Sequence, residues 1–202
     1  MLSFKNVGLI MLATVSTVSM AGPATDVEIN SVKNIPKLES GVTYKNGVVT
    51  WVGPFEYGEL MTFEVLTEGK RVNKIRFDSN GGRATVGDKM AEFVKNNNVE
   101  VEILRFCDSA CTTVAINSPK LSGPGILGFH LSYLPEPSGD MIGDIGYMLL
   151  SERIKDDNAS YIKMWKDNPY LTDSDIELIL SESNMDVTID YSVEYLNSNL
   201  KK

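Results

Sequence analysis

Residues 99–113 read VEVEILRFCDSACTT, and they contain the clearest local signal in the chain. Apolar residues at 99, 101 and 103 alternate with glutamates, which is the pattern of a β-strand. The strand is expected to end near Phe106, and Ser109 falls at the start of the helix that should follow. The stretch therefore predicts a strand-to-helix turn with Ser109 between Cys107 and Cys111.

Strands and helices alternate from about residue 46 onward. Apolar residues two apart predict the strands, and apolar residues three or four apart predict the helices. Strand–helix–strand units with right-handed crossovers build a parallel sheet beneath helices. We therefore predict an α/β fold with a largely parallel, helix-covered sheet. The predicted strands are 48–52, 72–77, 99–106 and 126–131, and the predicted helices are 57–67, 84–97, 112–116 and 144–166.

Two shorter elements are expected near the C-terminus. Ser174 and Glu177 have the spacing of a capping box, which predicts a short helix through about Leu180. Residues 191–196 are expected to form a last amphipathic segment.

The N-terminus has the pattern of a secretory signal peptide. Lys5 precedes an apolar run that ends near Met20, and small residues flank a cleavage position after Ala21. An uncleaved anchor is the alternative, but the run is shorter than the roughly 20 apolar residues that a membrane span needs. We expect a signal peptide over 1–21, a polar lead-in over 22–45 and one domain over 46–202, in a periplasmic or secreted protein.

The chain is acidic, with a formal net charge of −8. Removal of residues 1–21 would leave 181 of the 202 residues, and the loss of Lys5 would change the charge from −8 to −9. Nucleic-acid-binding proteins carry basic surfaces, so we expect no nucleic acid as a partner. An acidic protein is also repelled by anionic membranes.

Cys107 and Cys111 are the only cysteines. They connect nothing distant, so a disulfide framework is excluded. We expect either a local disulfide or two packed thiols. A zinc site is disfavoured because the chain has one histidine, His130, and zinc usually takes four ligands. No metal or cofactor is expected.

Three motifs fall at the predicted carboxyl ends of strands, where open α/β sheets place their sites. They are DSNGG at 78–82, CDSAC at 107–111 and GFH at 128–130. Each also has an ordinary structural explanation: a turn, a helix N-cap and a structural histidine. A serine nucleophile needs a base, however, and one helix plus one returning strand separate Ser109 from His130. The order of the motifs therefore favours a serine hydrolase.

The series strand–DSNGG–helix–strand–CDSAC–helix–strand–GFH resembles the proteolytic subunit of Clp protease, in the Clp/crotonase superfamily. It is most similar to periplasmic Clp-like proteins with a Cys-x-Ser-Ala-Cys turn, over about residues 46–200. The resemblance implies repeated ββα units and a peptide or protein substrate. Members are often oligomeric, so it also implies a homo-oligomer. Nothing in the chain resembles the features that dock an ATPase, and no ATPase partner is expected.

The same resemblance assigns roles to residues. Ser109 resembles the nucleophile and His130 the general base, and the N–H groups of Gly82 and Ala110 resemble the oxyanion hole. The family's acidic third member aligns roughly with Glu182, with Asn184 and Asp186 as rivals.

Three alternatives stay open. A Ser–Lys peptidase similar to signal-peptide peptidases would use Ser109 with Lys155 or Lys163 as the base. A catalytically silent binding or scaffold protein would keep the fold without the chemistry. A crotonase-type acyl-CoA enzyme is disfavoured by export, because CoA thioesters are cytosolic.

Overall fold

The computed structural model describes residues 22–132, 141–183 and 187–200. The predicted signal peptide lies outside these residues, as do Asn184 and Asp186. Among the helices of the described residues, none has both the length and the apolar composition needed to cross a membrane.

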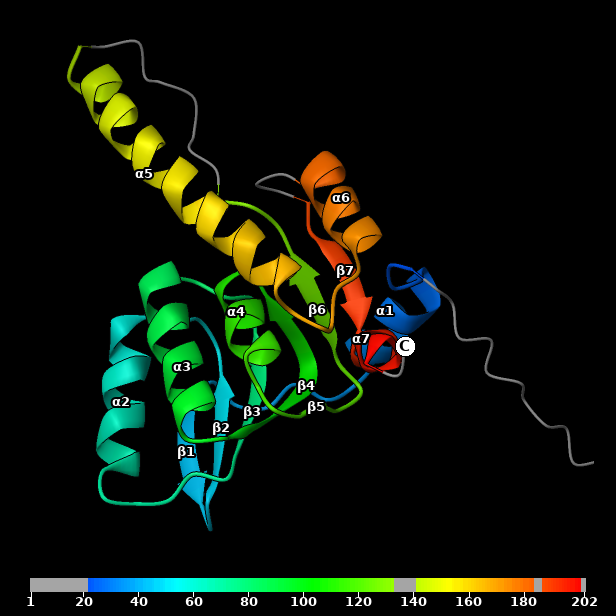
Figure 1. The fold of residues 1–202 in the computed structure, drawn as a ribbon. Coiled ribbons are helices and arrows are strands. Elements are labelled where there is room, and N and C mark those ends of the chain that lie inside the picture. The colour runs from blue at the N-terminus through cyan, green and yellow to red at the C-terminus, as the bar shows by residue number, and fades with distance from the viewer. Residues whose placement is uncertain (1–21, 133–140, 184–186, 201–202) are drawn as a thin grey trace, which may run out of the picture.

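The structure is an α/β fold with a mixed seven-stranded sheet and, in the described residues, seven helices (Figure 1). The strands are β1 (Gly41–Lys45), β2 (Val48–Val52), β3 (Lys74–Ser79), β4 (Glu100–Asp108), β5 (Leu121–Ser122), β6 (Ile126–Phe129) and β7 (Ile189–Ser192). The helices are α1 (Asp26–Lys33), α2 (Tyr57–Thr67), α3 (Ala84–Asn96), α4 (Ala110–Ile116), α5 (Met141–Lys166), α6 (Asp173–Glu182) and α7 (Val193–Asn199).

The sheet is parallel in its middle and antiparallel at both edges. Its order is β1-β2-β3-β4-β6-β7, with β5 paired to β4. Strands β2, β3, β4 and β6 run parallel, whereas β1 pairs antiparallel with β2 and β7 pairs antiparallel with β6. Both edge strands were missed from the sequence. β1 lies inside the expected polar lead-in, and β7 precedes α7 where one amphipathic piece was expected.

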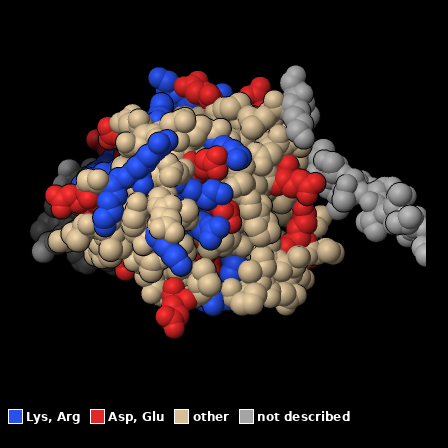
Figure 2. Space-filling model, turned by 90° about the horizontal axis from the view of Figure 1, so that it is seen from below, with Lys and Arg blue, Asp and Glu red and all other residues tan. Residues whose placement is uncertain are grey.

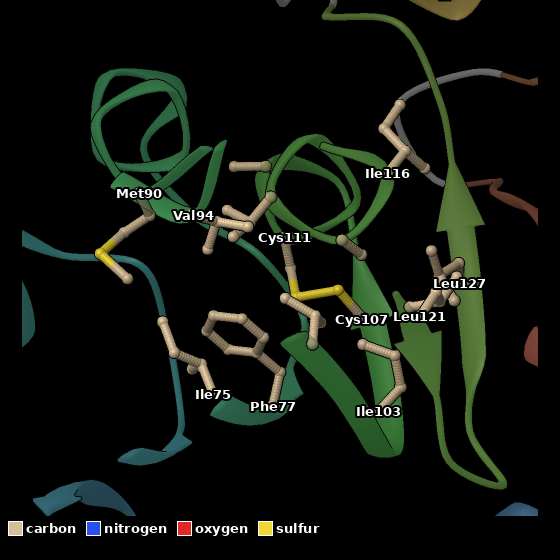
Figure 3. Packing of buried hydrophobic residues seen from close by; sticks show 14 of the residues in the cluster. Ile75, Phe77, Met90, Val94, Ile103, Cys107, Cys111, Ile116, Leu121 and Leu127 are labelled. Carbon is tan, nitrogen blue, oxygen red and sulfur yellow. A yellow bond between two sulfur atoms is a disulfide. The ribbon is translucent and has the colours of Figure 1, made fainter. Parts of the chain in front are cut away.

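Helices α2, α3 and α4 lie side by side over one face of the sheet (Figure 1). On α3, Val86, Met90 and Val94 recur every four residues and are all buried, because this stripe faces the sheet. Figure 3 shows Met90 and Val94 above Ile75 and Phe77 of β3. This contiguous core fixes the positions at which the central strands end.

Two of the differences from the predicted boundaries concern His130 and the start of α6. His130 was expected inside a strand, but β6 ends at Phe129 and leaves His130 just beyond it. The cap of α6 is Thr172, which pairs reciprocally with Asp175, so the prediction of Ser174 was wrong. Both patterns occur in the sequence LTDSDIE, and Asp175 is the buried member that also accepts from Tyr195 Oη at 2.8 Å.

Basic and acidic side chains lie close together at the end of the sheet opposite α5. Figure 2 shows Lys and Arg side chains in the middle of this lower face, with Asp and Glu among and around them. At the starts of β3 and β4, Lys74 Nζ lies 3.2 Å from Glu102 Oε2, and Lys120 Nζ lies 3.1 Å from Glu100 Oε1. These basic groups are therefore partly neutralised by neighbours.

The cap of α6 gives a test of stability. Replacing Thr172 with Ala removes the oxygen that accepts from the Asp175 N–H, and we expect a loss of about 1 kcal/mol in the free energy of unfolding. Ser174→Ala is the matched control and should cost less than about 0.5 kcal/mol. Urea unfolding of both variants measures this, and an equal loss in the two would contradict the assignment of the cap.

Candidate functional site

The carboxyl ends of three neighbouring parallel strands meet at one small pocket. The loop after β3 contributes Gly82, the turn after β4 contributes Ser109, and the residue after β6 is His130. The pocket has a volume of about 50 Å³. Its other lining residues are Ala84, Ala110, Thr112, Thr113, Ser132, Tyr161 and Trp165.

Ser109 has a backbone conformation that L-residues rarely adopt. Its φ is 54° and its ψ is −125°, at the junction of β4 and α4. Although Ser109 occupies the N-cap position, its side chain makes no capping hydrogen bond. Its hydroxyl has no hydrogen-bond partner among the described residues. The ordinary role of a serine at this place, capping the helix, is therefore not performed, and the residue lines the pocket.

Backbone contacts on both sides hold this strained turn. The Ser109 N–H donates to the Gly128 carbonyl of β6 at 2.9 Å. The Ser109 carbonyl accepts from the Thr112 N–H at 2.9 Å and from Thr112 Oγ1 at 2.7 Å. Such a conformation costs on the order of 1–3 kcal/mol and persists only where its surroundings impose it.

Cys107 and Cys111 form a disulfide across the turn (Figure 3). Of the two states that the sequence left open, the structure has the bonded one. The cysteines are two residues before and two residues after Ser109, and their Cα atoms lie 5.1 Å apart. Both are fully buried between the sheet and α4. The bond therefore ties the end of β4 to the start of α4 across the turn that contains Ser109.

The double glycine allows the loop after β3 to approach the same turn. Gly81 has a φ of 84°, and a Cβ there would lie 2.5 Å from the Asp108 carbonyl oxygen and 2.7 Å from Ser109 Cβ. Gly82 is clamped by Phe55, whose N–H donates to the Gly81 carbonyl at 2.7 Å and whose carbonyl accepts from the Arg83 N–H at 2.8 Å. Only glycine fits at 81 and 82, because both sites combine a positive φ with close backbone contacts.

Two backbone N–H groups at the pocket have no acceptor. Those of Gly82 and Ala110 donate to no atom within the described part of the chain, and both residues line the pocket. Unpaired N–H groups are uncommon in folded proteins, since most are satisfied by the protein or by water. Two of them beside a serine hydroxyl form an arrangement that can hold an oxygen atom carrying negative charge.

His130 shares the pocket with Ser109, but no hydrogen bond joins their side chains in the described structure. The imidazole Nδ1 lies 2.7 Å from the Leu131 carbonyl oxygen. A carbonyl oxygen can only accept, so Nδ1 carries the hydrogen in the neutral ring and Nε2 keeps its lone pair.

The residue offered as the acidic third member and the two lysines of the Ser–Lys alternative lie away from the pocket where the structure describes them. Glu182 is exposed on the last turn of α6 and does not line the pocket. Asn184 and Asp186 lie outside the described residues. Lys155 and Lys163 are exposed on α5, and neither lines the pocket.

Sequence reasoning missed the side of the pocket that α5 forms. Tyr161 and Trp165 belong to an apolar stripe of this helix, and apolar stripes usually indicate packing alone. Burial raises the pKa of Tyr161 to about 12, and the carboxylates of Asp88 and Asp157 add to the shift. The Tyr161 hydroxyl therefore stays protonated at neutral pH.

Asp108, next to Ser109, is half-buried and lies near other carboxylates. Burial and, to a smaller extent, the Asp190 carboxylate of β7 raise its pKa to about 7, against a hydrogen bond from the Gly128 backbone. A Cβ on Gly128 would lie 2.6 Å from Asp108 Oδ1 and 2.9 Å from Asp190 Oδ1. Burial also raises the pKa of Asp190. Two carboxyl groups thus flank the glycine whose carbonyl holds Ser109.

Other hollows lie elsewhere on the molecule. One, of about 470 Å³, has Asp78, Ser79 and Arg105 among its lining residues. A larger one, of about 680 Å³, lies between α2 and α3, and its lining contains no histidine, serine or cysteine. Over residues 22–132, 141–183 and 187–200, no group of three His, Cys, Asp or Glu side chains is arranged to hold a metal ion.

Comparison of the chain with models of known protein families gave no match, and comparison with curated protein sequences gave none either.

The raised pKa of Asp108 predicts a pH-dependent stability. A carboxyl group whose pKa is higher in the folded chain than in the unfolded chain stabilises the fold fully at a pH below its ordinary pKa of 3.8. This stabilisation is lost as the pH rises to the folded-state pKa of about 7. Asp108→Asn should remove the decline and raise the free energy of unfolding at pH 8 by on the order of 2 kcal/mol. Urea unfolding between pH 4 and 8 measures it, with the exposed Asp156→Asn as control. Parallel curves for wild type and Asp108→Asn would show the assignment to be wrong.

The backbone of Ser109 can be tested without any activity. Glycine adopts a φ of 54° without strain, whereas alanine does not. We expect the free energy of unfolding of Ser109→Gly to be about 1 kcal/mol higher than that of Ser109→Ala. Thermal or urea unfolding of the two variants gives the comparison, and a more stable alanine variant would rule out the strained turn.

Proposed function

We propose that this chain is a serine hydrolase that cleaves peptide or protein substrates, with Ser109 as its nucleophile. The observation that carries the proposal is the turn at Ser109. Its hydroxyl is free of any capping bond, and its backbone is held at a φ of 54° between a strand and a helix. Strained strand-to-helix turns of this kind present nucleophiles in hydrolases.

His130 acts as the general base in this proposal. With Nδ1 held by the Leu131 carbonyl, Nε2 is free to take the proton from Ser109 Oγ. The Ser109 oxygen then forms a bond to the substrate carbonyl carbon, and the carbonyl oxygen becomes an oxyanion. The distance between the two side chains has to shorten when substrate binds, as is common for catalytic pairs in unliganded enzymes.

The N–H groups of Gly82 and Ala110 stabilise that oxyanion. Neither donates to another atom of the described chain, so both can donate to the developing charge. The peptide C–N bond then breaks, and the proton on His130 passes to the leaving amine. In the second half of the reaction, water attacks the acyl-enzyme and His130 takes the proton from that water. His130 then returns the proton to the Ser109 oxygen as the acyl group leaves.

In this proposal the Leu131 carbonyl replaces the acidic third residue of a catalytic triad. In serine proteases the third residue mainly orients the histidine and sets its tautomer. A main-chain carbonyl at 2.7 Å from Nδ1 supplies both effects, although without the negative charge of a carboxylate. We therefore propose a Ser109–His130 dyad.

At the level of fold, we propose a member of the Clp/crotonase superfamily, exported to the periplasm by the signal peptide over residues 1–21. The middle of the sheet supports the first part, because β2, β3, β4 and β6 follow one another in parallel with α2, α3 and α4 between them. The buried disulfide supports export, since disulfides persist in oxidising compartments. We propose no ATPase partner.

An alkyl fluorophosphonate probe tests the nucleophile. The folded protein should be labelled at Ser109, and Ser109→Ala should not be labelled. His130→Gln should lower the labelling rate by at least about a hundredfold, because the base that activates the serine is lost. Mass spectrometry of the labelled peptide identifies the residue.

Lys155→Met and Lys163→Met are matched controls, and both should be labelled at the rate of wild type. Full labelling of His130→Gln together with loss in either lysine variant would support the Ser–Lys alternative instead. If the folded wild type takes no label, the chain is better described as a silent binding or scaffold protein.

A further inference from the structure

A second, larger pocket adjoins the Ser109 site at the double glycine. Gly81 lines this pocket, whereas Gly82, the next residue, lines the pocket of Ser109. The second pocket has a volume of about 470 Å³, which is large enough for a side chain or a chain end of a peptide. It lies at the ends of β2, β3 and β4, and Arg105 of β4 is among its lining residues, so we call it the Arg105 pocket.

An irregularity in the sheet brings Arg105 to this pocket. Phe77 of β3 pairs with Ile103 of β4, but Ser79 pairs with Cys107, so β4 spans four positions where β3 spans two (107 − 103 and 79 − 77). In a regular strand Arg105 would share a face with Ile103 and Cys107, which lie in the core beneath the helices (Figure 3). Bulges of this kind redirect side chains, often next to functional sites.

The guanidinium of Arg105 keeps one nitrogen available to a ligand. Its Nη1 lies 3.4 Å from Oδ2 of the buried Asp78, and its Nε is enclosed without a hydrogen-bond partner. Its Nη2 makes no hydrogen bond within the described chain and, unlike Nε, is not enclosed. The side chain is 15% exposed, and its Cζ lies 5.6 Å from the centroid of the Phe106 ring, which helps to fix the group in place.

The charges around the Arg105 pocket favour an anion. Lys37 also lines the pocket, is exposed, and forms no ion pair within the described part of the chain. Two cationic side chains and one carboxylate, that of Asp78, are thus the charged groups of the lining, although the whole chain has a net charge of −8. One carboxylate on a ligand would balance this excess, and a guanidinium is well suited to bind it.

The two pockets are close enough for one peptide to occupy both. A Cβ on Gly81 would lie 2.7 Å from Ser109 Cβ, so the residue that lines the Arg105 pocket also touches the proposed nucleophile. Successive residues of an extended peptide advance by about 3.3–3.6 Å. A residue a few positions from the scissile bond can therefore reach the Arg105 pocket.

We infer that the Arg105 pocket binds a carboxylate of the peptide substrate, either an acidic side chain or the C-terminal group, through Arg105 and Lys37. This inference rests on the proposed function, because it concerns the substrate of Ser109. Asp78 holds Arg105 in position, and as a neighbouring carboxylate it also limits the affinity for the ligand.

The experiment measures peptide binding to the full chain with Ser109→Gly, which lacks the nucleophile and relieves the strained turn. The probes are octapeptides of alanine and glycine with an uncharged fluorophore at the N-terminus. One series has an amidated C-terminus and carries glutamate at each inner position in turn, with glutamine peptides as neutral matches. A second pair has no acidic side chain and ends in a carboxylate or in an amide.

Fluorescence polarisation gives the Kd of each peptide. We expect a carboxylate in one of these places to lower the Kd about tenfold relative to its neutral match, which is the effect of a charge-assisted hydrogen bond. The series in which the effect occurs distinguishes an acidic side chain from the C-terminal group.

Two variants, made in the Ser109→Gly chain, should change this preference in opposite directions. Lys37→Met removes one exposed cation and should lower the preference about threefold. Asp78→Asn keeps an oxygen that accepts from Arg105 and removes the competing charge, so the preference should rise by at least about threefold. Lys45→Met and Asp156→Asn make the same changes of charge outside the pocket and should leave it unaltered.

The double variant Asp78→Asn/Arg105→Gln removes the guanidinium without leaving a buried carboxylate unpaired. We expect it to bind charged and neutral peptides equally. Circular dichroism and thermal unfolding establish that each variant is folded.

The inference is refuted if no carboxylate improves binding in either series, or if no peptide binds. A preference that is the same in Lys37→Met and Asp78→Asn as in their parent would also refute it. If the fluorophosphonate nevertheless labels Ser109 in the wild-type chain, the hydrolase remains. A carboxylate preference in a chain that takes no label would overturn the proposed function and, with it, the role of this pocket toward a substrate.

Discussion

The close approach of two backbone segments controls the geometry of this site. The loop after β3 lies so near the β4–α4 turn that a Cβ at Gly81 would come within 2.7 Å of Ser109 Cβ. The disulfide between Cys107 and Cys111 and the hydrogen bond to the Gly128 carbonyl hold the same turn. Together they maintain a conformation of Ser109 that would otherwise relax, since it costs on the order of 1–3 kcal/mol.

Strain and unpaired donors occur at the same place. Ser109 has no capping bond, the N–H groups of Gly82 and Ala110 have no acceptor in the described chain, and the indole N–H of Trp165 is buried without one. Each would lower stability if it stood alone in a core. Ser109, Gly82 and Ala110 line the same pocket, and two N–H groups beside a hydroxyl can hold an oxygen atom that carries negative charge.

The aromatic core connects the sheet to this pocket. Phe55 clamps Gly82 through its backbone, while its ring packs against Trp51 and Phe77 at centroid distances of 5.0 and 5.5 Å. On the other side, Phe129 fixes Trp165 just before His130. The position of the loop that contains Gly82 and that of the end of α5 therefore both depend on buried rings, so that packing far from Ser109 contributes to the geometry at Ser109.

Local patterns in the sequence were sufficient for the alternating elements of the central sheet, the strand-to-helix turn at Ser109 and the grouping of Gly82, Ser109 and His130. Periodicity reports which side of an element is buried, and parallel strands bring their carboxyl ends to one edge. The edge strands β1 and β7 were missed because short, partly exposed strands carry a weak pattern. The Thr172 cap was missed because two overlapping cap patterns compete in the same residues.

Other features of the site were decided by tertiary structure alone. The unpaired state of Trp165 Nε1 and the bond from His130 Nδ1 to the Leu131 carbonyl depend on which atoms meet across the fold. The same holds for the raised pKa of Asp108, which arises from burial beside a carboxylate on a strand 82 positions away (190 − 108). The sequence by itself determined which residue types stand at the strand ends. Only the folded chain decided which polar atoms there are satisfied and which are free, because hydrogen bonding and burial are properties of contacts between distant segments.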